Sequence, residues 1–179
     1  KIVVKFNKRS RITSFASNAV NGLGAHVKNC WIGSVYSGQK NSEKEIALQQ
    51  FSSSKKPAVL VQCSILDEAW DCPLADCIVF GDPSASKNRI QQFNGLVTRV
   101  VKGKGDSGCV VPLFIKEGEG ESYDEAVRRT NFDIVCNTLA HRLDPDGVLS
   151  QGVGETGPEE VRRIKGFIRN TIRDIFTIE

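Results

Sequence analysis

The chain has 179 residues, of which 40% are hydrophobic and 25% charged, and its formal net charge at pH 7 is +3. These values are ordinary for a soluble globular protein, and so small a charge does not by itself indicate a nucleic-acid partner. No apolar run approaches the length of a bilayer-spanning helix, so we expect no membrane partner. The sequence contains no methionine, from which we expect a fragment of a longer polypeptide.

Strand and helix patterns alternate along the first two-thirds of the chain. β-branched residues predict a short strand over 2–6. Apolar residues at helical spacing over 12–23 predict one helix, which Ser10 or Thr13 can cap. A second strand is predicted over 31–36. This order of elements is typical of an α/β domain.

The same alternation continues to residue 114. The capping-box pattern from Ser42 to Glu45 predicts the start of a second helix, with Ile46 and Phe51 on one face. A third helix is predicted over 86–101. Further strands are predicted over 59–63, 76–80 and 109–114. Continuous apolar strands separated by helices predict a parallel sheet with helices on both faces.

Ligands of such sheets gather at the carboxyl ends of the strands. The loops that begin with Cys63–Ser64 and Gly81–Asp82 follow predicted strands, so we expect them at this edge. Any binding or catalytic chemistry is therefore expected there.

A charged, glycine-rich break from Lys116 to Glu121 predicts a boundary between a sheet domain, 1–116, and a helical extension, 117–179. The capping-box pattern from Ser122 to Glu125 predicts a helix whose apolar stripe continues to Leu143. Pro158 suits the first turn of a final helix with a wide apolar face. The predicted fold is thus α/β with a C-terminal helical extension.

Six cysteines and two histidines are spread along the chain, and no two cysteines form a CxxC pair. A zinc site needs paired soft ligands at short spacing, so we predict no metal site of this kind. Reduced thiols are typical of an intracellular protein, and we expect a cytoplasmic or nuclear location.

Four segments stand in an order that matches a known family. A strand leads into Asn7-Lys8-Arg9-Ser10, and Ser37-Gly38-Gln39 follows the second strand. The segment from Val61 to Pro73 contains a Glu68-Ala69-Trp70-Asp71-Cys72-Pro73 loop, and Gln92 to Arg99 contains Gln-x-x-Gly-x-x-x-Arg. Over about residues 1–115 the chain resembles the C-terminal RecA-like domain of superfamily 2 helicases, of the DEAD/DEAH-like kind.

The resemblance implies a role in ATP hydrolysis with Mg²⁺. Charge builds up on the γ-phosphate during hydrolysis, and an arginine from the facing domain stabilises it. Arg99 is the candidate for this arginine finger, and Gln92 can orient a phosphate or a water. Asp71 and Glu68 are the candidate nucleotide-side carboxylates, and Gly95 lets the backbone approach closely.

The resemblance also implies a single-stranded DNA or RNA partner, held along its sugar-phosphate backbone. The sequence contains neither a GxxxxGK[ST] loop nor a DExx box, so an upstream RecA-like domain is expected to hold ATP and Mg²⁺. The Gly103–Gly108 loop leads into a strand and is read as a surface loop that touches nucleic acid through Lys102 and Lys104. The candidate nucleic-acid contacts are Lys8, Arg9, Ser37, Gly38, Cys63 and Ser64.

Three departures from the family pattern motivate other hypotheses. Leu96 stands where the family has its first motif arginine, Ala69 replaces a glycine, and Cys63–Ser64 replaces Thr-Asp. The second hypothesis is therefore a degenerate, non-catalytic helicase-like module for interaction or regulation. A third is a small-molecule α/β enzyme that uses Asp71, Glu68 or Cys63, although no nucleophile–base–orienter set is visible.

Overall fold

The computed structural model describes residues 1–63, 74–82, 86–98, 101–112, 114–130, 135 and 166. The chain divides into two compact units, Lys1–Asp82 with Gln92–Val111, and Pro83–Gln91 with Pro112–Glu179. The boundary after residue 116 stays a prediction. None of the helices in the described part of the chain has the length and apolarity needed to cross a bilayer.

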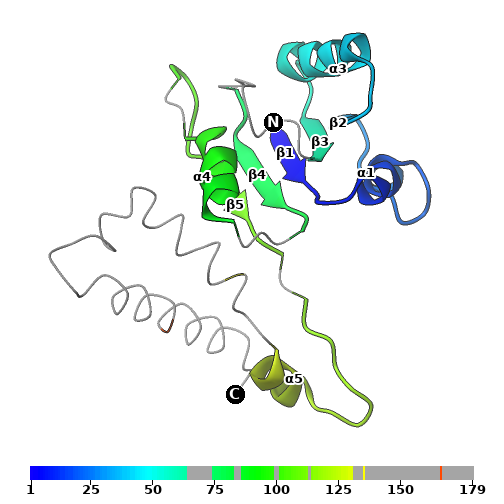
Figure 1. Cartoon of the computed structure of the whole chain (residues 1–179), viewed down its shortest axis with the longest axis vertical. Helices are drawn as coiled ribbons and strands as arrows, with labels where there is room; N and C mark the ends of the chain where they lie inside the picture. Colours follow the sequence, from blue (N-terminus) through cyan, green and yellow to red (C-terminus); the bar gives the residue numbers. More distant parts are fainter. Residues whose placement is uncertain are drawn as a thin grey trace, which may run out of the picture. The chain divides into compact units, whose positions relative to one another are not determined.

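Five parallel strands form a single sheet in the order β2-β3-β1-β4-β5 (Figure 1), as the alternating pattern predicts. The last strand is shorter than predicted, because Pro112 follows it and has no N–H to donate to a ladder. The strands are β1 (Ile2–Lys5), β2 (Trp31–Tyr36), β3 (Ala58–Cys63), β4 (Cys77–Phe80) and β5 (Gly108–Val110).

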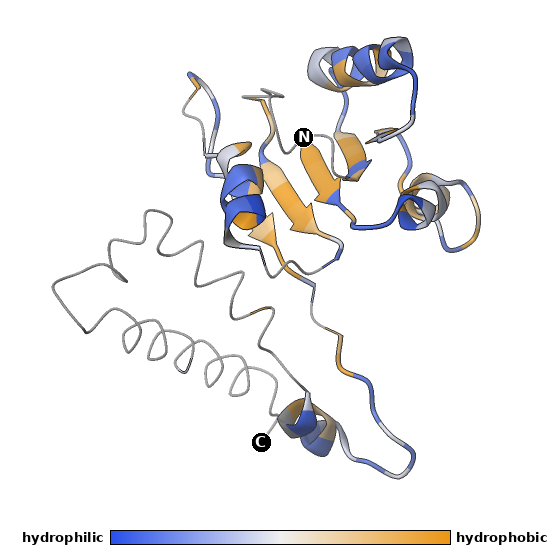
Figure 2. Ribbon diagram, in the orientation of Figure 1, coloured by the Kyte–Doolittle hydropathy of each residue, from blue (hydrophilic) through white to orange (hydrophobic). Residues whose placement is uncertain are grey.

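One face of the sheet packs under α1 (Arg9–Ala16). Val4 is in register with Val61 on β3 and with Val79 on β4, so the three side chains form a row on this face. Ile12 of α1 is fully buried in the cluster that contains Val4 and Val61. In Figure 2, β1, β4 and β5 are coloured mainly as hydrophobic, whereas α3 and α4 include many hydrophilic residues.

The opposite face is covered by α3 (Asn41–Ser53) and by the end of α4 (Lys87–Gly95). The register places Val3, Leu60 and Ile78 side by side on this face, and all three are fully buried. Phe51 of α3 is also fully buried, with its ring 6.0 Å from that of Trp31 on β2. Helices therefore cover both faces, which is the arrangement predicted for a RecA-like sheet.

The first predicted helix is interrupted. α1 ends at Ala16, and a four-residue α2 begins only at Leu23 and ends at His26. The Ser17 hydroxyl donates to the Ser14 carbonyl (2.8 Å) and accepts from the Ala19 N–H (3.3 Å). Serine thereby competes with the helical ladder, so the prediction of one helix over 12–23 is wrong. The residue before α1 is Lys8, and no side chain caps the helix.

The capping box predicted for α3 is not formed. The helix begins at Asn41, and no side chain caps its start. Ile46 is 54% exposed whereas Phe51 is buried. Five residues turn an α-helix by about 140° beyond one full turn, so these two side chains cannot share a face. The sequence-based pairing of Ile46 with Phe51 is therefore wrong.

α4 is shorter than predicted, because it ends at Gly95 and not at residue 101. The N–H of Leu96 donates to the Phe93 carbonyl (3.2 Å), and the N–H of Val97 donates to the Asn94 carbonyl (3.1 Å). Such i→i−3 bonds tighten the last turn of a helix and end it.

The predicted capping box at Ser122 is confirmed. The Ser122 hydroxyl accepts from the Glu125 N–H, and the Glu125 carboxylate accepts from the Ser122 N–H (2.9 Å). The helix behind it, α5 (Tyr123–Arg129), ends at Thr130, whose backbone is extended. The predicted continuous helix to Leu143 is therefore interrupted at Thr130. The predicted final helix lies outside the described residues, apart from Gly166, which is helical.

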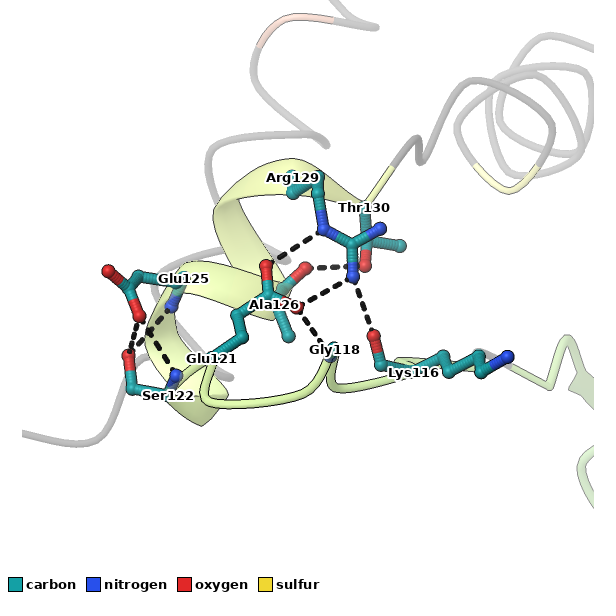
Figure 3. Close-up of polar contacts among 8 residues, drawn as sticks. All are labelled: Lys116, Gly118, Glu121, Ser122, Glu125, Ala126, Arg129 and Thr130. Carbon is teal, nitrogen blue, oxygen red and sulfur yellow. Dashed lines mark hydrogen bonds and ion pairs between the residues drawn. The ribbon is translucent and has the colours of Figure 1, made fainter.

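An ion pair closes the charged loop before α5 (Figure 3). The Arg129 guanidinium donates to both oxygens of Glu121, at 2.8 Å each, and to the Lys116 carbonyl at 2.7 Å. The N–H of Gly118 also donates to Glu121, at 2.6 Å. These bonds, first those from Arg129 and then that from Gly118, lower the pKa of the Glu121 carboxyl from 4.5 to about 2.

We expect this loop to stay closed at neutral pH and to open only in strong acid. A carboxyl whose folded pKa is depressed contributes stability above its ordinary pKa, and this contribution is lost as the pH falls from 4.5 through about 2. A carboxyl-detected NMR titration of the chain should place the Glu121 midpoint near the lower value. In an Arg129→Gln variant, the midpoint should rise toward 4.5; an unchanged midpoint would contradict the ion-pair explanation.

Candidate functional site

A stacked arginine and tyrosine lie at the carboxyl ends of β1 and β2. The guanidinium carbon of Arg9 is 4.3 Å from the centre of the Tyr36 ring, and an Arg9 nitrogen is 3.5 Å from the Tyr36 hydroxyl. Arg9 is exposed and Tyr36 is half-buried. A guanidinium held over an aromatic face loses side-chain freedom but keeps N–H donors at its rim. The pair therefore presents an oriented cation at this edge of the sheet.

A tight turn after β2 completes this part of the edge. The N–H of Gln39 donates to the Tyr36 carbonyl (3.3 Å), and Gly38 adopts a φ of +86°, which favours glycine at the third position of such a turn. A Cβ on Gly38 would lie 3.9 Å from the Arg9 guanidinium. The structure thus brings Arg9 and Gly38, both predicted from the sequence to contact nucleic acid, to the same edge.

A buried carboxylate ties the end of β4 to the start of α1. Asp82 is 5% exposed, and it accepts from the Asn7 N–H (2.7 Å) and from the Arg11 guanidinium. The N–H of Asp82 donates to the Lys5 carbonyl (3.2 Å). Buried charges are stable in proteins only when they are paired and hydrogen-bonded, as this one is. These bonds hold in place the turn from which Lys8 and Arg9 emerge.

A lysine is buried at the end of the central strand. Lys5 is 2% exposed, and its ammonium nitrogen lies 5.5 Å from the centre of the Phe93 ring on α4. Phe80, the register partner of Lys5 on β4, meets the same ring edge to face at 5.0 Å and 86°. These contacts combine cation–π and aromatic pairing and attach the end of α4 to the sheet.

Phe93 belongs to the Gln-x-x-Gly-x-x-x-Arg segment, of which the structure describes residues 92–98. Gln92 is exposed, and a Cβ on Gly95 would meet no described atom within 4 Å. Leu96 is 6% exposed and Val97 is fully buried. The position where the family resemblance expects its first arginine is therefore a core position in this chain.

Restoring that arginine is expected to destabilise the fold. Leu96→Arg would bury a charge with no prepared partner, which should lower the free energy of unfolding by about 3 kcal/mol. Urea denaturation of the chain measures this. Leu96→Met is the matched control and should change the free energy by less than about 1.5 kcal/mol. If the Leu96→Arg variant is as stable as the wild type, the side chain at position 96 can reach solvent.

The remaining candidates fall into three groups: exposed residues, one buried residue, and residues that the structure does not describe. Lys8 and Ser37 are exposed at the carboxyl edge, next to Arg9 and Gly38 respectively. Cys63 is 8% exposed, and its side chain belongs to the cluster under α1, so only its backbone faces the edge. Arg99, Asp71, Glu68 and Ser64 lie outside the described residues.

The sequence-based prediction gave no role to three residues that organise this edge, Lys5, Tyr36 and Asp82, although it placed the Gly81–Asp82 loop there. A signal for such a role existed for two of them. Lys5 interrupts an apolar strand of a sheet buried on both faces, where a charge needs a structural reason. Asp82 directly follows a buried strand at the edge where ligands and charges gather. Tyr36 carried no signal, because its partner Arg9 comes from a different element.

In the described part of the chain, no three His, Cys, Asp or Glu side chains are placed to hold a metal ion. The Asp82 carboxylate accepts from Asn7 and Arg11.

Neither a protein-family model nor a curated protein sequence matches the chain. Among solved structures, it matches an ATP-dependent Type ISP restriction-modification enzyme, LlaBIII, bound to DNA, with a TM-score of 0.63 and 18% identity. That match covers 99% of this chain and 13% of the enzyme. It also matches domain 2 of the DEAD-box helicase Mss116p bound to an RNA duplex, with a TM-score of 0.52 and 10% identity over 95% of this chain and 74% of that one.

At these identities the matches establish the fold alone. The chain has the α/β fold of a RecA-like domain, as the sequence predicts. It spans about an eighth of the length of the restriction-modification enzyme.

Proposed function

We propose that this chain is the second motor domain of an ATP-dependent nucleic-acid helicase or translocase. It supplies Arg99 to ATP hydrolysis and part of a surface for a single strand of DNA or RNA. An upstream RecA-like domain of the same polypeptide holds ATP and Mg²⁺, and without it this domain is inactive. The protein works inside the cell, in the cytoplasm or the nucleus.

The observation that carries the proposal is the arrangement at the carboxyl edge of a RecA-like sheet. Lys8 and Arg9 follow β1, and the Ser37–Gly38 turn follows β2, so two cations and two exposed turn residues share one edge. Backbone amides and hydroxyls in such turns can donate to phosphates, and an oriented guanidinium can bind one bidentately. This chemistry suits a sugar-phosphate backbone and carries no base specificity.

The role of Arg99 rests on its place in the chain. It follows Val97 by two residues, at the end of the segment that Lys5 and Phe80 attach to the sheet through Phe93. An arginine in this position can stabilise the charge that develops on a transferred phosphoryl group held by a facing domain. Gln92, exposed on the same segment, orients a phosphate or a water, and Asp71 and Glu68 face the nucleotide.

Mg²⁺, when bound, would neutralise charge on the nucleotide. We assign its main ligands to the upstream domain, as the family resemblance implies. In this scheme the present chain positions cationic groups and does not hold the metal.

The burial of Leu96 favours a second candidate, a degenerate helicase-like module for interaction or regulation. With a buried leucine at this position, the chain lacks one phosphate-binding arginine of the family pattern. The rate of ATP hydrolysis by the full-length protein, measured with and without single-stranded nucleic acid, separates the two candidates. Hydrolysis stimulated by single-stranded nucleic acid supports the motor, whereas nucleic-acid binding without hydrolysis supports the degenerate module.

Arg9→Ala is expected to weaken nucleic-acid binding and its dependence on salt. Loss of one phosphate contact should reduce the slope of log affinity against log salt by about 0.7 for a single strand. Fluorescence anisotropy with a labelled oligonucleotide at several salt concentrations measures both changes. Lys28→Ala is the control, because this exposed lysine precedes β2 at the opposite edge of the sheet. Equal effects of the two substitutions would contradict a binding surface at the carboxyl edge.

A further inference from the structure

The glycine-rich loop from Gly103 to Gly108 is folded against the segment that leads into Arg99. Its first turn is closed by the Lys104 N–H, which donates to the Val101 carbonyl at 3.0 Å. Gly103 adopts a φ of +86° at the third position of this turn. At its other end the N–H of Gly108 donates to the Asp76 carbonyl at 2.8 Å, where β5 begins. The loop is therefore held at both ends.

Two side chains of this loop converge on one carbonyl. The Lys104 ammonium donates to the Val97 carbonyl at 2.7 Å, and the Ser107 hydroxyl donates to the same oxygen. Lys104 and Ser107 are half-buried, whereas Lys102 and Asp106 beside them are exposed. Lys104 is thus turned inward, whereas Lys102, just before the loop, is exposed.

The Val97 carbonyl lies just beyond the end of α4, where a helix needs such donors. The last carbonyls of a helix lack intrahelical partners and carry partial negative charge, which a nearby lysine stabilises. The last turn of α4 contains no basic residue of its own. Lys104 supplies this charge from a separate loop, and Val97 is fully buried, so water has little access to the bond.

We propose that Lys104 and Ser107 are positioning residues for Arg99. By holding the Val97 carbonyl, they fix the peptide group that follows Val97, two residues before Arg99. The inference rests on the proposed role of Arg99, and it gives the glycine-rich loop a function other than nucleic-acid contact. Lys102, just before the loop, is exposed, whereas Lys104 holds the Val97 carbonyl and so supports Arg99.

The support itself is tested in the 179-residue chain by amide hydrogen exchange. Lys104→Met keeps the length of the side chain and removes the charge and the donor. We expect the amides of Leu96 and Val97 to exchange about tenfold faster, because a bond from a charged donor is worth at least that factor in an opening equilibrium. Ser107→Ala should show a smaller increase at the same amides, Ser107→Thr should restore protection, and Lys102→Met should leave them unchanged.

The effect on Arg99 is tested by ATP hydrolysis in the full-length protein. Lys104→Met should lower kcat about tenfold with KM for ATP changed less than about twofold, because a misplaced catalytic group weakens the transition state more than the ground state. Adding Arg99→Ala to this variant should remove the effect of Lys104→Met, since both act through the same side chain.

Each result has a distinct meaning. Unchanged exchange in Lys104→Met would overturn the support. Faster exchange with unchanged kcat, in a protein whose activity requires Arg99, would overturn the positioning role. If Arg99→Ala alone leaves hydrolysis unchanged, the proposed function of Arg99 fails instead, and the exchange result still decides whether the support exists.

Discussion

Arg99→Ala is expected to lower kcat for nucleic-acid-stimulated ATP hydrolysis by about a thousandfold or more in the full-length protein. Removing an arginine finger costs this much because the charge on the transferred phosphoryl group loses its main stabilising partner. KM for ATP should change far less, since this contact strengthens in the transition state. Steady-state hydrolysis at saturating nucleic acid measures both constants.

Two further variants make this result specific. Arg99→Lys should recover little of the activity, because an ammonium cannot replace a planar bidentate guanidinium. Arg89→Ala, at an exposed arginine in the first half of α4, is the matched control and should stay within about twofold of the wild type. A similar kcat in the Arg99→Ala variant and in the wild type would remove Arg99 from the mechanism and favour the degenerate module.

Asp82→Ala is expected to lower the free energy of unfolding by about 3 kcal/mol. The substitution removes the buried carboxylate that accepts hydrogen bonds from the Asn7 N–H and from the Arg11 guanidinium. It should also loosen the turn that carries Lys8 and Arg9, so nucleic-acid affinity should fall together with stability. Urea denaturation and anisotropy on the same samples measure the two effects.

The contribution of the ion pair can be isolated by a double-mutant cycle. Arg11 is 56% exposed, so Arg11→Met alone should cost about 1 kcal/mol or less. The double variant should cost less than the two single variants added together, because they remove the same contact. Asp106→Ala, at an exposed loop carboxylate, is the control and should be close to neutral. Additive costs would show that Asp82 stabilises the turn through the Asn7 N–H and not through Arg11.

Strand positions followed from local pattern, while helix lengths did not. Trp31–Tyr36 was predicted to the residue. The strand predicted over 59–63 differs from β3 by one residue, because a parallel strand buried along its whole length is an almost continuous apolar run. The prediction of one helix over 12–23 was wrong, because hydrophobic spacing does not show that the Ser17 hydroxyl competes with the helical hydrogen bonds. α4 ended early for a similar reason, since its last turn is closed by i→i−3 bonds and by donors from a later loop.

The sequence alone determined the class of fold and the edge at which function was to be sought, because apolar periodicity and motif order are local properties of the chain. Only the tertiary structure decided which side chains act together. The stacking of Arg9 on Tyr36, the pairing of Asp82 with Arg11 and the reach of Lys104 to Val97 join residues that lie on different elements. Contacts of this kind depend on how strands and loops are placed side by side, and no spacing along the sequence records that placement.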